Sequence, residues 1–99
     1  MRILIIEDEK EIADFLKRGL ENECFAVDVA EDGEKGSFLA LTNDYDLIIL
    51  DYILPKKDGR QVCEKIRKAG KTIPILVLSV KSEIPTKIDI LNLNYLQQI

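Results

Sequence analysis

The chain has 99 residues, of which 14 are Lys or Arg, 18 are Asp or Glu and none is His, and its formal net charge at pH 7 is −4. A chain of this length forms one domain around a single core, and its mild acidity argues against direct binding of this segment to nucleic-acid phosphates. The lack of histidine excludes serine–histidine and cysteine–histidine nucleophilic pairs and most transition-metal sites, so carboxylates must carry any chemistry.

Nothing in the sequence predicts a membrane segment or a signal sequence. The apolar run after Arg2 is four residues long and meets Glu7, far short of the roughly 18 apolar residues of a membrane span. The sequence therefore predicts a cytoplasmic protein. Cys24 and Cys63 lie far apart among apolar neighbours, which favours reduced, packed thiols over a disulfide or a metal site.

The first half of the chain predicts two strands, each followed by a helix. Residues 3–6 are apolar throughout, as in a parallel strand covered on both faces. Residues 8–22 have a helical period. The apolar face of that helix consists of Ile12, Phe15, Leu16 and Leu20. Residues 25–30 alternate around Asp28, which predicts an edge strand, and residues 33–41 predict a second helix. Its apolar positions are Phe38 and Leu41.

The second half continues the alternation. Residues 47–50 and 75–78 are apolar throughout and predict buried strands, and residues 58–68 between them predict a third helix. Its inner positions are Val62 and Ile66, and Gly70 suits the C-cap. This order of elements, with right-handed crossovers, predicts an α/β fold with an open, doubly wound parallel sheet.

The pattern weakens after Ser79. Residues 85–93 predict a fourth helix, with Ile88 and Leu91 on its apolar face, followed by a few residues of extended chain.

Carboxylates follow two of the predicted strands, Glu7, Asp8 and Glu9 after the first and Asp51 after the third. In open α/β sheets, ligands bind at the carboxyl ends of the strands, where the strand order reverses. If these strands are neighbours, roughly 4.8 Å apart, the carboxylates converge. Converging carboxylates repel one another unless a cation joins them, and oxygen ligands favour Mg²⁺. A carboxylate beside Mg²⁺ can act as a nucleophile toward phosphorus.

Each carboxylate also has an interpretation that needs no site. Asp8, with Glu11 three residues later, could cap the first helix, Asp51 could form a turn, and Glu7 and Glu9 could be solvated charges. Their common position at strand ends favours a site. Ser79 carries a hydroxyl at the end of the fourth predicted strand, and Pro55 and Gly59 follow Asp51 in the sequence.

The stretches ILIIEDE, DLIILDYILPKKDG and IPILVLS together resemble the receiver domain of bacterial two-component response regulators. The opening MRILIIEDE is similar to the branch whose members usually continue into a winged-helix DNA-binding domain that controls transcription. The resemblance covers residues 1 to about 93. It implies a flavodoxin-like sheet with strand order 2-1-3-4 and a signalling domain rather than an enzyme.

The resemblance also implies roles for individual residues. Asp51 would be the phosphoacceptor that takes a phosphoryl group from a phosphohistidine of a sensor histidine kinase. Mg²⁺ would bind in an acidic pocket. Its ligands would come from Glu7, Asp8, Asp51 and the main-chain carbonyl of Ile53. Ser79 would be the switch hydroxyl that binds the phosphoryl oxygens.

The end of the chain departs from the family pattern. Tyr95 resembles a switch aromatic, but the usual Lys-Pro step is absent and no lysine follows Lys87. The usual cation is therefore missing unless Lys81 substitutes for it. We therefore expect one receiver domain over residues 1–99, truncated after about residue 93, with a vestigial or missing fifth strand, no fifth helix and no effector domain. A bare edge at residues 75–78 would then favour a homodimer or a swapped oligomer.

Three alternatives stay open. The first is a receiver fragment that no longer switches and acts only as an interaction or dimerisation module. The second is a flavin or nucleotide binder of the same topology, although Glu7, Asp8 and Glu9 stand where such a protein needs a phosphate-binding loop. The third is a hydrolase with an Asp nucleophile, which normally has a second Asp where this chain has Ile53.

Overall fold

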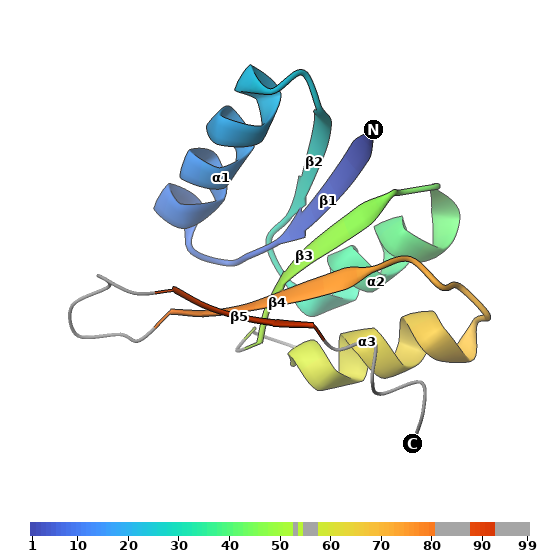
Figure 1. Ribbon diagram of the computed structural model, residues 1–99. Coiled ribbons are helices and arrows are strands. Elements are labelled where there is room, and N and C mark those ends of the chain that lie inside the picture. Colours follow the sequence, from blue (N-terminus) through green and yellow to red (C-terminus); the bar gives the residue numbers. More distant parts are fainter. Residues whose placement is uncertain (53, 55–57, 81–87, 93–99) are drawn as a thin grey trace.

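The computed structural model describes residues 1–52, 54, 58–80 and 88–92 of the chain. They form a five-stranded sheet in the order β2-β1-β3-β4-β5 (Figure 1). The strands are β1 (Arg2–Ile6), β2 (Ala26–Ala30), β3 (Leu47–Asp51), β4 (Ile75–Val80) and β5 (Ile88–Asn92). The first four strands are parallel and follow the order 2-1-3-4, with β2 at an edge, so the predicted flavodoxin-like fold is confirmed.

The three helices that the described residues form cover the two faces of the sheet. Helix α1 (Lys10–Asn22) lies on one face, and α2 (Gly33–Thr42) and α3 (Gly59–Lys68) lie on the other (Figure 1). Because successive strand residues point to opposite faces, two apolar clusters form. The strand residues facing α2 and α3 are Leu4, Ile6, Ile48, Leu50, Ile75 and Val77, and those on the α1 side are Ile3, Ile5, Ile49 and Leu78. In the part of the chain that the structure describes, no helix is long and apolar enough to cross a membrane.

The predicted helix faces are only partly correct. Val62 and Ile66 of α3 are fully buried, as predicted, whereas Phe15 of α1 is 72% exposed and Phe38 of α2 is 64% exposed. The buried positions of α1 and α2 are occupied by small residues, namely Ala13, Gly33, Gly36, Ser37 and Ala40. These small residues let the helices approach the sheet closely. Large aromatic side chains are therefore placed on the outer surface.

The strand β5 corrects the prediction of a fourth helix over residues 85–93. Residues Ile88–Asn92 form a strand that pairs antiparallel with β4, and the rest of that range lies outside the described residues. The prediction of a bare edge at residues 75–78 is also wrong, because β5 pairs along this edge. The reason given for self-association, an unpaired edge at β4, is therefore absent. Homodimerisation itself stays a prediction.

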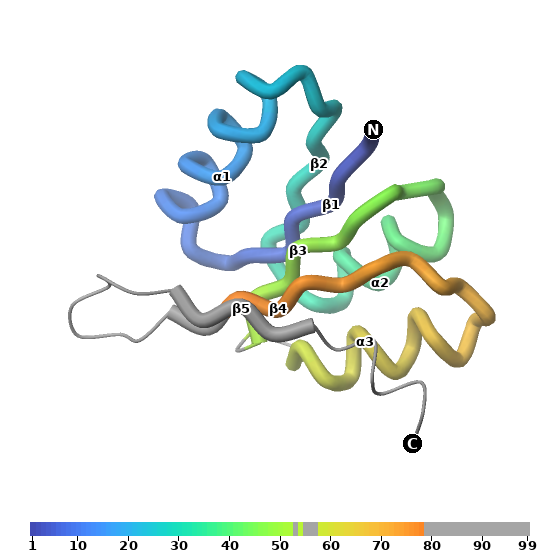
Figure 2. The backbone as a smooth tube through the Cα atoms, viewed as in Figure 1, coloured from blue at the N-terminus to red at the C-terminus, as the bar shows by residue number. Residues whose placement is uncertain are grey.

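A polar cluster at the amino ends of β1 and β3 holds these strands in register. The backbone N–H of Arg2 donates to an Asp46 carboxylate oxygen at 2.8 Å, and the Arg2 guanidinium pairs with Asp28 at 3.0 Å. The Tyr45 hydroxyl donates to the same Asp28 oxygen at 2.7 Å, which lowers the pKa of Asp28, and burial together with Asp28 raises the pKa of Tyr45 to about 12. The cluster thus joins β1, β2 and the start of β3. Figure 2 shows β1 and β3 running side by side, although more than 40 residues separate them in the sequence.

The two cysteines differ from each other. Cys63 is buried in α3, where burial raises the pKa of its thiol, as expected of a packed thiol. Cys24 is exposed, so its predicted place in the core is wrong. Its φ of 69° lies in the left-handed region, because the chain must turn sharply between α1 and β2.

Replacing Cys24 by glycine is expected to raise the free energy of unfolding by about 1 kcal/mol, because glycine adopts a left-handed conformation without the steric cost of a Cβ atom. Urea denaturation followed by circular dichroism measures this gain. The variant Cys24→Ala keeps the Cβ atom and should give no gain. Equal stabilisation by both substitutions would assign the effect to loss of the thiol instead.

Candidate functional site

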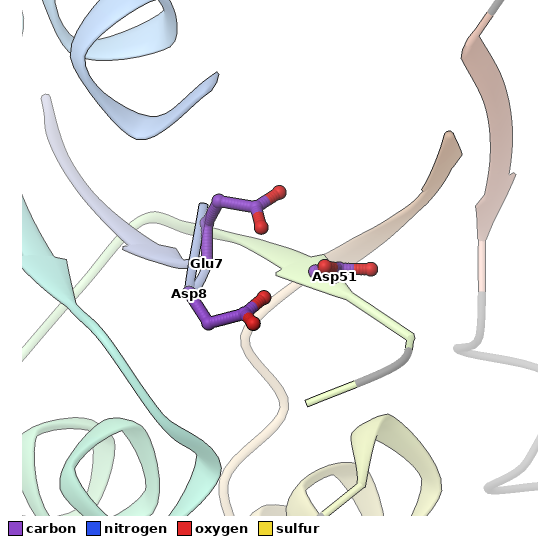
Figure 3. A group of neighbouring side chains, drawn as sticks. All are labelled: Glu7, Asp8 and Asp51. Atoms are coloured by element: carbon purple, nitrogen blue, oxygen red, sulfur yellow. The ribbon is translucent and has the colours of Figure 1, made fainter. Parts of the chain in front are cut away.

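The register of the sheet brings three carboxylates to one point. Ile6 of β1 pairs with Leu50 of β3, so the next residues, Glu7 and Asp51, lie side by side at the carboxyl ends of the two strands. One oxygen from each of Glu7, Asp8 and Asp51 lies within 4.8 Å of the others. Figure 3 shows the Glu7 and Asp8 side chains reaching from the end of β1 toward Asp51 at the end of β3. The convergence that the strand ends predict is therefore present.

Glu7 is the buried member of this acidic cluster. Its exposed fraction is only 3%, so it is not a solvated surface charge. The backbone N–H of Glu7 donates to the Ala30 carbonyl at 2.9 Å, and Oε2 of Glu7 accepts from the Glu9 backbone N–H at 3.0 Å. Burial raises the pKa of Glu7 to about 8. The hydrogen bond from Glu9 opposes this shift, and interactions with Asp51 and Asp8 add to it.

Asp8 is exposed and does not cap the first helix. The N-cap of α1 is Glu9, and no side chain accepts a hydrogen bond there, so the capping interpretation of Asp8 is wrong. The Asp8 carboxylate belongs instead to the acidic cluster.

Asp51 is the last residue of β3 and is held by the sheet rather than by a turn. It pairs with Leu78 of β4, and the next backbone N–H, that of Tyr52, donates to the Leu78 carbonyl at 3.3 Å. Its side chain is half-buried. The carboxylate therefore stands on a rigid element at the edge of the acidic cluster.

The chemistry of this cluster fits Mg²⁺. All three donor groups are carboxylates, and one of them is nearly inaccessible to water and has a strongly raised pKa. A divalent cation would offset both the burial of Glu7 and the mutual repulsion of the three groups. Mg²⁺ takes one or two carboxylates directly and keeps several waters, which suits a cluster that includes an exposed and a half-buried member.

Other predicted site residues fall where the structure says nothing of their side chains. Four of them lie outside the described residues, namely Ile53, Lys81, Lys87 and Tyr95. For Ser79 only the backbone is described. Ser79 is part of β4 and pairs with Asp89 of β5.

One backbone contact of Gly59, close to Asp51, was not predicted from the sequence. The backbone N–H of Gly59, at the start of α3, donates to the carbonyl of Tyr52 at 2.8 Å. The only signal for it in the sequence is the fixed spacing of Gly59 from Asp51, which by itself indicates no more than a turn.

A comparison with known families identifies the architecture. Residues 3–99 match the family described as the response regulator receiver domain. The chain belongs to this family. Over 88 residues the receiver domain is 43% identical to the transcriptional regulatory protein CusR of Escherichia coli K12. That match covers 89% of this chain, which spans 39% of the length of CusR.

Solved structures agree with this assignment. The receiver domain of the Francisella response regulator 1452 is 34% identical, with a TM-score of 0.77 over 83% of this chain and 68% of that one. The receiver domain of a Pseudomonas aeruginosa sensor histidine kinase is 27% identical, with a TM-score of 0.77 over 83% of this chain and 69% of the other. That structure contains a magnesium ion in its active-site cleft. A protein similar to this receiver domain thus binds a metal ion in its active-site cleft.

Proposed function

We propose that this receiver domain accepts a phosphoryl group on the Asp51 carboxylate in a Mg²⁺-dependent reaction, with a sensor histidine kinase as the donor. A carboxylate oxygen of Asp51 forms a bond to phosphorus, and the bond from phosphorus to the imidazole nitrogen of the donor breaks, so the electron pair leaves with the imidazole. The observation that supports this most directly is the acidic cluster itself, in which a strand presents Asp51 beside Glu7 and Asp8.

Within this proposal the three carboxylates have different roles. Asp51 is the nucleophile, and its half-buried position at the end of a rigid strand supports that role. Glu7 and Asp8 would hold the cation, and Asp51 and the main-chain carbonyl of Ile53 would complete the ligand set. Bound Mg²⁺ would supply neutralisation of charge on the transferring group. Ser79 would bind the phosphoryl oxygens, and Tyr95 would respond as a switch aromatic.

The wider role is proposed from the relatives. Since CusR is a transcriptional regulatory protein, we infer that phosphorylation here controls a DNA-binding output in the cytoplasm, with this domain acting as a signalling partner rather than as an enzyme. Homodimerisation is part of the same proposal. The alternative, an interaction module that no longer accepts phosphate, makes the opposite prediction in the following test.

Incubation with a small acyl phosphate and Mg²⁺ is expected to add one phosphoryl group to the chain, as measured by intact mass. Asp51→Asn should abolish the gain, because an amide is no nucleophile toward phosphorus. Asp44→Asn makes the same change at an exposed position in the loop before β3 and should keep the gain. A wild-type chain that gains no mass, or gains it equally with EDTA present, would contradict the proposal.

A further inference from the structure

Gly59 lies unusually close to the backbone of the residue that follows Asp51. A Cβ atom built on Gly59 would stand 2.8 Å from the Cα atom of Tyr52, 3.0 Å from its carbonyl oxygen and 3.2 Å from the carbonyl oxygen of Asp51. Contacts below 3.0 Å force a displacement. Here the neighbours are backbone atoms, which cannot swing aside as the end of a long side chain can. Any side chain at position 59 must therefore move either α3 or the segment at Asp51.

Helix α3 is firmly anchored, so the segment at Asp51 is the part that yields first. Val62, Cys63 and Ile66 are fully buried against the sheet. A capping box fixes its first turn, since Asp58 Oδ1 accepts from the Gln61 backbone N–H at 2.9 Å and Gln61 Oε1 accepts from the Asp58 backbone N–H at 3.1 Å. The first turn of α3 is therefore a rigid surface for the strand end to rest on.

Tyr52 connects this surface to the acidic cluster. Its carbonyl accepts from the Gly59 N–H at 2.8 Å, and its own N–H donates to the Leu78 carbonyl at 3.3 Å. Both backbone polar groups of Tyr52 are thus in use, one toward α3 and the other toward β4. A shift of Tyr52 is transmitted directly to Asp51, its covalent neighbour.

We propose that Gly59 is a positioning residue for Asp51: because it has no side chain, the first turn of α3 can close on the backbone of Asp51 and Tyr52 and fix the direction of the Asp51 carboxylate toward Glu7 and Asp8. This inference rests on the proposed function. It gives a physical reason for the spacing of eight residues between Asp51 and Gly59.

The test substitutes Gly59→Ala in the whole chain. Phosphorylation of Asp51 by a small acyl phosphate is expected to slow by roughly tenfold or more at saturating acyl phosphate and Mg²⁺, because a displacement of a few tenths of an ångström spoils the alignment of the attacking oxygen. Isothermal titration should show several-fold weaker Mg²⁺ binding. In metal-free protein, the amide resonances of Asp51 and Tyr52 should shift.

Two control variants separate positioning from general stability. Gly19→Ala makes the same substitution inside α1, where a Cβ atom meets nothing within 4 Å, and should leave rate and affinity unchanged. Ile66→Val weakens the packing of α3 away from Gly59 and should lower stability without lowering the rate at saturation. Adding Gly19→Ala to Gly59→Ala raises stability and should not restore the rate.

The outcomes are distinct. A folded Gly59→Ala variant with wild-type rate and Mg²⁺ affinity would overturn the proposal. If that variant does not fold, Asp58→Ala decides, because Asp58 is exposed and its loss only loosens the first turn. We expect a rate at least threefold below that of Ile66→Val, and equal rates would overturn the proposal. A wild-type chain that binds Mg²⁺ but takes no phosphoryl group would defeat the proposed function, while weaker Mg²⁺ binding by Gly59→Ala would still support positioning.

Discussion

Without metal, the stability of this protein is expected to fall as the pH rises from about 5 to about 8, and Glu7→Gln is expected to remove that fall. Burial raises the pKa of Glu7 from 4.5 to about 8 in the folded chain. Between these values the folded state keeps a proton that the unfolded state has lost. The stabilisation is complete below the unfolded pKa and is lost through the folded one, with a slope of at most about 1.4 kcal/mol per pH unit.

The absence of histidine simplifies the measurement, because histidine is the side chain whose charge ordinarily changes between pH 5 and 8. Urea denaturation in EDTA at several pH values gives the slope. Glu21→Gln, an exposed change on α1, serves as the control and should keep the wild-type slope.

Adding Mg²⁺ should flatten this dependence. A cation binds the ionised carboxylate, so its stabilising effect grows as the pH rises and Glu7 loses its proton. Glu7→Gln should therefore be more stable than the wild type at pH 8 in EDTA, yet should gain less from Mg²⁺. A wild-type protein whose stability is flat between pH 5 and 8 in EDTA would show that Glu7 is ionised in the folded state.

The sheet could be predicted because its strands are buried on both faces. Residues 3–6, 47–50 and 75–78 are apolar at every position, a pattern that a surface strand does not allow. The alternating pattern around Asp28 predicted an edge strand, and β2 does lie at an edge of the sheet. The acidic cluster followed from these strands, because parallel neighbours end at the same edge of a sheet and carry Glu7 and Asp51 with them.

The errors arise where tertiary contacts decide. The pattern of residues 88–92 is too short to distinguish helix from strand, and β4 offered backbone partners that favour a strand. Phe38 is outside because Gly36 faces Ile6, where a Cβ atom would approach side-chain atoms to 2.5 Å. The near-complete burial of Glu7 could not be predicted either, because a carboxylate at a strand end is usually solvated.

Asp8 and Asp32 provide a second test with a large expected effect, because both are acidic residues near a helix start but have different roles. Asp32 is the N-cap of α2, where its Oδ1 accepts from the Lys35 N–H at 2.7 Å. Asp8 makes no such cap in α1. Asp32→Ala should therefore cost about 1 kcal/mol of stability and leave Mg²⁺ affinity nearly unchanged.

Asp8→Ala should have the opposite profile. Loss of one of three carboxylates is expected to weaken Mg²⁺ binding at least tenfold, whereas metal-free stability should hold or rise, because one like charge beside Glu7 and Asp51 is gone. Calorimetric titration with Mg²⁺ and urea denaturation in EDTA measure the two quantities on the same samples. If Asp8→Ala lost stability and kept its affinity, Asp8 would belong to the helix and not to the metal. The contrast between the two aspartates thus separates the structural from the functional use of the same side chain.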